Sequence, residues 1–221
     1  MPDDRPQAAA TARLDRIRTR FERLKALEAE HGFGVHLADG IALESVPGIP
    51  EGAREVFQII DRIEGSLFRF QRPPEVGDPA ALRKLPDNPH DPLGPALSIG
   101  CELHRIPTRL RAEIDGGEAI LLDLTDGDVY HIQPDDYVFL YTHPEQDVDI
   151  HVFAPDIVTF FDEYVLGGKY PRLVETVLGP GVLERRVNRG RFRGEYEDTW
   201  LRLLATAGLL SEPVPSVAPP A

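Results

Sequence analysis

Two short apolar runs, separated by an Asp-Gly turn, constrain the fold of this chain more than any other feature of its sequence. Residues 119–124 are almost entirely apolar, as in a central strand that is covered on both faces. Residues 125–128 read Thr-Asp-Gly-Asp, a turn sequence that joins hairpin strands, and residues 129–132 leave it with β-favouring side chains. A connection this short joins antiparallel strands. The sequence therefore predicts an antiparallel hairpin inside a sheet.

The β pattern extends from about residue 96 to residue 153, and further strands are predicted at 137–141 and 148–153. Apolar residues at three- and four-residue steps flank this region. They predict helices over residues 11–31, 50–64, 155–166, 171–178 and 195–207. We therefore expect an α+β fold, with a mainly antiparallel central sheet flanked by helices.

Two of the predicted helices have clear end signals. In the first, residues 14, 17, 21, 24 and 27 are apolar and share one face, and Gly32 fits a left-handed cap. In the second, Pro50 suits the first turn, the stripe runs through Val56, Ile59, Ile60 and Ile63, and Gly65 closes the helix. We expect the first helix to dock on the domain and the second to continue to residue 64.

The chain of 221 residues is long enough to bury a core without disulfides or metals. We expect residues 11–208 to form one domain, with its core at about 45–170, a Pro-rich loop insertion at 72–95 and a helical extension at 180–208. Residues 1–10 and the Pro-rich tail at 209–221 are expected to be disordered.

Composition favours a cytoplasmic protein. Cys101 is the single cysteine, which suits a reducing compartment. The first residues have no long apolar core, so we expect no secretory signal, and no segment is apolar enough to span a bilayer. The sequence does not fix the oligomeric state.

The net charge of −13 is concentrated in one stretch. From residue 112 to residue 168 there is no Lys or Arg, while acidic and basic residues nearly balance in the rest of the chain. The fourteen acids of this stretch are Glu113, Asp115, Glu118, Asp123, Asp126, Asp128, Asp135, Asp136, Glu145, Asp147, Asp149, Asp156, Asp162 and Glu163. Such a field repels nucleic acid and membrane surfaces and attracts cationic partners.

Two interpretations of this acidic stretch stay open. It is either the solvated outer face of an antiparallel sheet or a surface that binds a basic protein. For the second interpretation the candidate partner-binding residues are Asp115, Glu118, Asp126, Asp128, Asp135, Asp136, Asp147 and Asp149. Alternation along a strand could divide these residues between two faces.

Catalytic and metal chemistry find little support in the sequence. The Asp123–Asp128 segment lacks the ligand spacing of a calcium loop. The histidines at 104, 131, 143 and 151 form no diagnostic pair, and Cys101 stands beside Glu102, which disfavours a thiolate. We therefore expect no metal, no cofactor and no enzymatic activity.

An arginine cluster follows the acidic stretch, at residues 185–193. Alone it could contact nucleic acid, but the acidic stretch works against that. Alternatively, the arginines neutralise the acidic face of the domain or cap the last helix.

Three segments carry a resemblance to a known family. Residues 48–51 (Gly-Ile-Pro-Glu), with the apolar run up to Gly65, resemble the opening of SUKH domains. Residues 118–123 (Glu-Ala-Ile-Leu-Leu-Asp) with 127–130 (Gly-Asp-Val-Tyr) resemble the strand pair of that superfamily, and residues 154–170 resemble its closing helix. The resemblance covers roughly residues 45–170 and implies an α+β fold that binds proteins without catalysis.

Many bacterial SUKH members are immunity proteins that neutralise toxins, often nucleases. The resemblance therefore implies a cytosolic protein that neutralises a toxin. The charge of the acidic stretch adds the hypothesis that its acidic face binds the basic surface of a toxin domain. A regulatory or scaffolding SUKH module is one alternative. A small hydrolase that uses Asp or His residues of the β region is another.

Overall fold

The computed structural model describes residues 5–85, 94–103, 117–133 and 150–211, and its centre is one antiparallel sheet. The seven strands lie in the order in which they occur in the chain, β1-β2-β3-β4-β5-β6-β7. They are β1 (His36–Asp39), β2 (Ile60–Glu64), β3 (Phe68–Gln71), β4 (Ala96–Glu102), β5 (Ala119–Asp123), β6 (Val129–Ile132) and β7 (Ile150–Ala154). The predicted strand at 137–141 lies outside the described residues.

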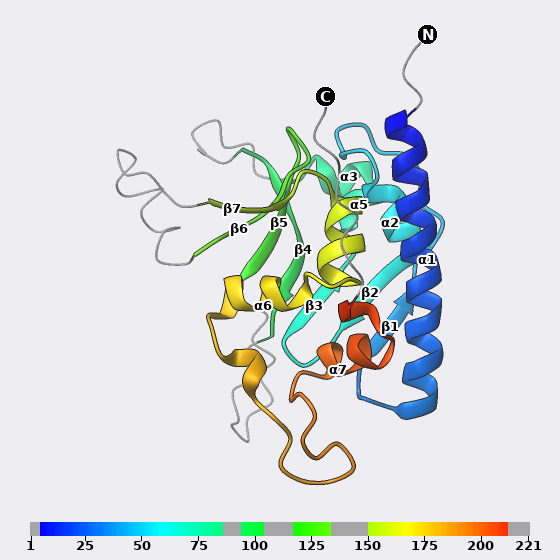
Figure 1. Cartoon of the computed structure of the whole chain (residues 1–221). Coiled ribbons are helices and arrows are strands. Elements are labelled where there is room, and N and C mark those ends of the chain that lie inside the picture. Colours follow the sequence, from blue (N-terminus) through cyan, green and yellow to red (C-terminus); the bar gives the residue numbers. More distant parts are fainter. Residues whose placement is uncertain (1–4, 86–93, 104–116, 134–149, 212–221) are drawn as a thin grey trace.

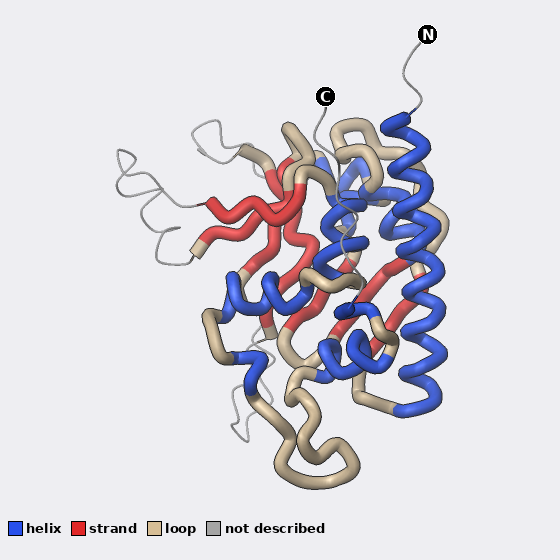
Figure 2. The backbone as a smooth tube through the Cα atoms, viewed as in Figure 1, coloured by secondary structure: helices blue, strands red, loops and turns tan. Residues whose placement is uncertain are grey.

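Helices gather over one face of this sheet (Figure 1, Figure 2). The α-helices among the described residues are α1 (Arg5–His31), α2 (Ala53–Ile59), α3 (Pro79–Leu82), α5 (Ile157–Phe160), α6 (Tyr170–Leu178) and α7 (Thr199–Thr206). Short 3-10 turns are η1 (Pro74–Val76), η3 (Val182–Glu184) and η4 (Leu209–Ser211), and η2 (Phe161–Val165) is a π-helical turn that continues α5. The fold class predicted from the sequence is confirmed.

Aromatic side chains join the sheet to the helices. Phe70 of β3 contacts both Phe160 and Phe161 edge-on, and Phe153 of β7 packs on Phe160. Trp200 of α7 is buried and donates a hydrogen bond from Nε1 to the carbonyl of Val165, at 3.0 Å. The core therefore lies between the sheet and α2, α5, η2, α6 and α7.

Helix α1 packs across α2, α5, η2 and α7. Ile17, Phe21 and Leu24 are fully buried, as the apolar spacing predicted. Gly32 follows the helix with φ of 62°, and its N–H donates to the carbonyl of Glu28 at 2.7 Å, which is the predicted cap. The helix begins at Arg5, however, so it is longer than the prediction from residue 11, and residues 5–10 are helical.

The helix predicted over residues 50–64 is wrong in its second half. Helix α2 ends at Ile59, and Ile60 already has extended backbone angles. Residues 60–64 form β2, which pairs with β1 on one side and with β3 on the other. The apolar spacing fits either structure, and the β-branched Ile60 and Ile63 suit the strand, where Ile63 lies between Leu37 and Phe70.

Two smaller differences concern the predicted insertion and the last helix. The described part of residues 72–95 contains η1 and α3, so it is not without secondary structure. Helix α7 begins only after Asp198, because residues 195–197 pair with residues 185–187 in an extended ribbon.

No helix among the described residues combines the length and the apolar character that crossing a membrane requires.

Candidate protein-binding surface

The predicted partner-binding acids fall in three places. Asp115, Asp135, Asp136, Asp147 and Asp149 lie outside the described residues. Asp126 and Asp128 lie in the turn between β5 and β6, which we call the acidic turn (residues 123–128). Glu118 lies just before β5, with its Oε2 4.0 Å from Nε2 of the buried His131.

The acidic turn is closed by its own side chains. Asp123 accepts hydrogen bonds from the backbone N–H groups of Thr125 (2.5 Å) and Asp126 (3.4 Å), and Asp126 accepts one from the N–H of Asp128 (3.1 Å). Gly127 adopts φ of 88°, which favours glycine at this position. These bonds explain why Asp and Gly stand here, and they bring three carboxylates together.

The carboxylates of the acidic turn have no Lys or Arg partner in the part of the chain that the structure describes. Burial, and then the neighbouring charges of Asp126 and Asp123, raise the pKa of Asp128. The acidic turn is therefore a point of unneutralised negative charge at one end of the sheet.

The sheet face opposite the helices carries two exposed apolar side chains on β7, the last strand in the described order, while Tyr130 and Ile132 on the same face are buried. Strand register places Leu121 opposite Tyr130, Tyr130 opposite Val152, and Ile132 opposite Ile150, so these side chains share the outer face. Ile150 is 43% exposed and Val152 is 49% exposed. Asp123 lies two residues from Leu121 on β5 and therefore points to the same face. We call Leu121, Ile150, Val152 and the acidic turn the outer patch.

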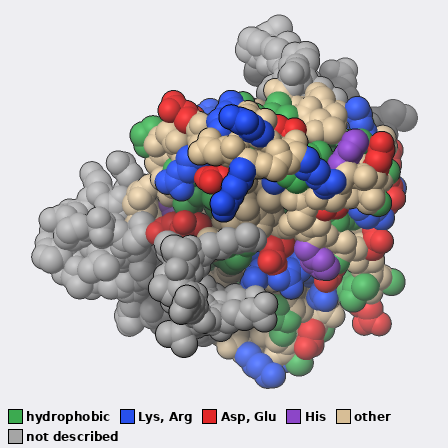
Figure 3. All heavy atoms as spheres, turned by 90° about the horizontal axis from the view of Figure 1, so that it is seen from below, with side chains coloured by type: hydrophobic (Ala, Val, Ile, Leu, Met, Phe, Trp, Pro, Cys, Tyr) green, Lys and Arg blue, Asp and Glu red, His purple; other side chains and the backbone are tan. Residues whose placement is uncertain are grey.

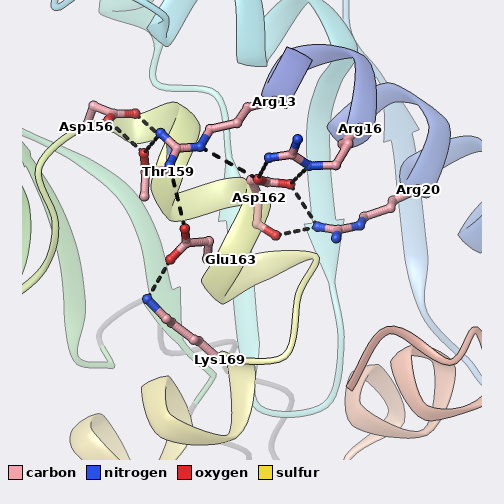
Figure 4. A network of polar contacts seen from close by, with 8 residues as sticks. All are labelled: Arg13, Arg16, Arg20, Asp156, Thr159, Asp162, Glu163 and Lys169. Atoms are coloured by element: carbon pink, nitrogen blue, oxygen red, sulfur yellow. Dashed lines mark hydrogen bonds and ion pairs between the residues drawn. The ribbon is translucent and has the colours of Figure 1, made fainter. Parts of the chain in front are cut away.

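The remaining described acids of the stretch face α1 instead (Figure 4). Asp162 is 3% exposed and is held by Arg16 and Arg20, at 2.6 Å from Nη2 and 2.8 Å from Nη1. Arg20 also donates to the backbone carbonyl of Asp162 at 2.7 Å. Glu163 pairs with Lys169 at 2.5 Å and lies 3.8 Å from a guanidinium nitrogen of Arg13.

The third acid of this group, Asp156, is the N-cap of α5. It accepts hydrogen bonds from the N–H and the hydroxyl of Thr159 at 2.6 and 2.7 Å, and that hydroxyl accepts one from Arg13 at 2.8 Å. The three acids therefore bind α1 to the domain, and we call this set the α1 network (Figure 4). The acidic stretch is not one surface, because its α5–η2 part is neutralised within the fold.

The two histidines of the β region that the structure describes, His131 and His151, have buried Nε2 atoms. His131 is buried with Nδ1 3.1 Å from the carbonyl of Ala119, and His151 stands opposite it across the β6–β7 pair. Burial is the main cause that lowers the pKa of both, and their Nε2 atoms are buried without a hydrogen-bond partner in this part of the chain. No group of three potential metal ligands occurs among the described residues. His104 and His143 lie outside them.

A buried carboxylate that the sequence analysis missed is Asp198. It accepts hydrogen bonds from the hydroxyls of Tyr170 (2.8 Å) and Ser66 (2.9 Å) and from the N–H of Trp200 (3.2 Å). Burial raises its pKa, while these hydrogen bonds act in the opposite direction. An Asp immediately before a helical apolar run is the signal that could have identified it as an N-cap. It ties α7 to α6 and to the β2–β3 turn.

In the described structure the arginine cluster does not cap the last helix, and it does not neutralise the acidic turn. Arg191 donates hydrogen bonds to the carbonyls of His31 and Gly32, the latter at 2.9 Å. It therefore caps the C-terminus of the first helix, α1, where carbonyl groups lack partners within the helix.

Comparisons with family models, with curated proteins and with solved structures find no match to this chain.

Proposed function

We propose that this chain is a non-catalytic protein-binding domain that uses the outer patch to bind a basic protein. The observation that carries the proposal is the placement of exposed apolar side chains. Among the described residues only Ile41, Ile150 and Val152 are large, apolar and exposed, and two of these three stand together on one sheet face. Exposed apolar side chains next to one another are typical of protein interaction sites.

The negative charge of the acidic turn indicates that the partner is a basic protein. Val152 pairs with Tyr130, two residues after Asp128, and the carboxylates of the acidic turn have no basic partner in the described residues. A basic surface that meets it gains faster association and specificity, with a strong dependence on salt. This fits a toxin domain that is basic where it holds nucleic acid. Together with the resemblance to SUKH domains, it makes toxin neutralisation in the cytosol the function that we propose.

A growth-protection experiment tests this function. A toxin domain encoded next to the gene for this chain is expressed with and without the chain, and the affinity of the purified pair is measured at two salt concentrations. We expect the wild type to protect the cells. The double variant I150D/V152D should lose protection and bind about a hundredfold more weakly, since two central apolar contacts are replaced by charges.

Ile41→Asp is the matched control, because Ile41 is 52% exposed but lies on the loop after β1. It should protect like the wild type, and circular dichroism should show all three proteins folded. Full protection by I150D/V152D would contradict the outer patch as the binding surface. Failure of the wild type to protect or to bind would contradict toxin neutralisation itself.

A further inference from the structure

A second charged surface lies at the other end of the molecule. Residues 185–197, which we call the Arg ribbon, form a loop whose two ends are joined by backbone hydrogen bonds and one antiparallel bridge, and it extends below α6 and α7 in Figure 1. The N–H of Glu197 donates to the carbonyl of Arg185 at 3.0 Å, and that of Val187 donates to the carbonyl of Glu195 at 2.9 Å. Arg186 and Tyr196 face each other in this ladder.

The Arg ribbon is fastened to the body of the protein. Arg191 binds the C-terminal carbonyls of α1, and the ring of Phe192 lies 5.7 Å from that of Phe33. The guanidinium of the buried Arg202 lies 4.2 Å from the Phe192 ring, and that of Arg186 lies 3.6 Å from the Tyr196 ring. A ribbon held in this way loses little conformational freedom when it binds a partner.

Most arginines of the ribbon have no carboxylate partner among the residues that the structure describes. Arg185, Arg186, Arg189 and Arg193 are exposed and make no ion pair with any described residue. In contrast, Arg13, Arg16 and Arg20 all pair with acids of the α1 network. From below, Lys and Arg side chains gather over this part of the surface (Figure 3). In a chain of net charge −13, four exposed arginines without an ion pair to any described residue lie on one segment, and such a concentration of positive charge attracts anions.

We propose that the Arg ribbon binds an acidic segment of a protein. Guanidinium groups match carboxylates with two parallel hydrogen bonds, and Arg is enriched where such recognition matters. Glu184, Glu195 and Glu197 stand among the arginines and are exposed. They would repel a continuous phosphate track, whereas a polypeptide can place carboxylates opposite the arginines alone.

This surface is separate from the outer patch. Gly127 of the acidic turn lies beside Pro50, ahead of α2, whereas the Arg ribbon leaves the opposite end of the molecule (Figure 1). Exposed charges that far apart are screened from one another at physiological salt, where the Debye length is about 8 Å. The two surfaces can therefore be tested and can fail independently.

The test uses the full chain and two labelled probes, a peptide of alternating Glu and Gly and an oligothymidylate of similar length, in fluorescence anisotropy. We expect the peptide to bind better than the oligonucleotide, and to bind more weakly as salt is raised. The variant R189E/R193E should bind the peptide about tenfold more weakly, since two exposed charge contacts are reversed. Within the described residues, neither side chain makes a hydrogen bond, an ion pair or a ring contact.

The matched control is R83E/K84E, which makes the same change of net charge at two exposed residues next to α3. It should bind the peptide almost as the wild type does. An equal loss in both variants would show an effect of net charge alone and overturn the proposal. A second outcome would also overturn it: the oligonucleotide binds the wild type more tightly than the peptide does, and R189E/R193E loses this binding. The ribbon would then be a nucleic-acid surface. Absence of peptide binding by the wild type at low salt would overturn it as well.

Discussion

The acidic stretch contains two groups of carboxylates whose surroundings are opposite. In the acidic turn, Asp123, Asp126 and Asp128 face one another without a basic partner in the described residues. In α5 and η2, Asp162 is enclosed by arginines that stand 142 and 146 positions earlier in the chain. The comparison shows that local sequence charge does not define surface charge, because a distant helix can neutralise one part of an acidic segment and leave another part free.

The largest difference between the two groups should appear when one carboxylate of each is removed. We expect Asp162→Asn to lower the free energy of unfolding by about 3 kcal/mol, since partly buried arginines lose their counterion. Asp126→Asn, in the acidic turn, should change it by less than about 0.5 kcal/mol. Urea denaturation of both variants measures the difference. Equal effects would mean that the α1 network does not stabilise the fold more than the acidic turn does.

Substituting arginines of α1 tests the same difference by removing the basic partner of an ion pair instead of the carboxylate. Arg20→Ala should cost about 2 kcal/mol, because Arg20 binds both the carboxylate and the backbone carbonyl of Asp162. Arg18→Ala on the same helix removes only an exposed pair with Asp15 and should cost less than about 0.5 kcal/mol. A double-mutant cycle of R20A with D162N should show coupling. Strict additivity in that cycle would count against a direct interaction.

A smaller loss is expected at the N-cap of α5. Asp156→Ala removes the acceptor for two hydrogen bonds from Thr159 and should cost about 1 kcal/mol. In a chain of this size such a loss lowers the thermal midpoint by roughly 2–4 °C. Calorimetry measures it, and Asp156→Ser, which keeps a cap, is the control. A midpoint that is the same for both variants would contradict a capping role.

The smallest expected effect is a gain in stability at Asp128. Because the pKa of Asp128 is raised in the folded protein, folding favours its protonated form, and stability is lost as pH rises through that pKa. Asp128→Asn should therefore stabilise the protein at neutral pH by less than about 0.5 kcal/mol. The gain should disappear at a pH below the ordinary range of an aspartate. Denaturant titrations at both pH values measure it, and a destabilised variant at neutral pH would show that the carboxylate is favourable.

The sequence predicted those elements of the fold whose signals are local. The Asp-Gly turn identified β5 and β6, and the apolar spacing of Ile17, Phe21 and Leu24 identified α1. It did not predict β1, whose four residues His-Leu-Ala-Asp contain no β-branched side chain. Nor did it separate α2 from β2, since the choice at Ile60 depends on the neighbouring strands, which are tertiary partners.

The candidate surface was predicted only in part, for the same reason. The charge excess is visible in the sequence, and so is the turn that gathers Asp126 and Asp128. The pairing of Asp162 with α1 is not visible, because Arg16 and Asp162 are 146 residues apart. The exposure of Ile150 and Val152 depends on which face the helices cover, and alternation along β7 alone does not show this.

The sequential order of the strands has a consequence for synthesis on the ribosome. Each strand pairs with the one made just before it, so the described sheet can grow at one edge as the nascent chain emerges. Helix α1 is made before the sheet, yet Arg13, Arg16 and Arg20 can pair with Asp162 only after β7 has been translated. An element made before the sheet is thus fixed in place only after the sheet has formed. Pulse-labelling hydrogen exchange during refolding should show protection of β5 and β6 before that of α1, and the opposite order would refute this sequence of events.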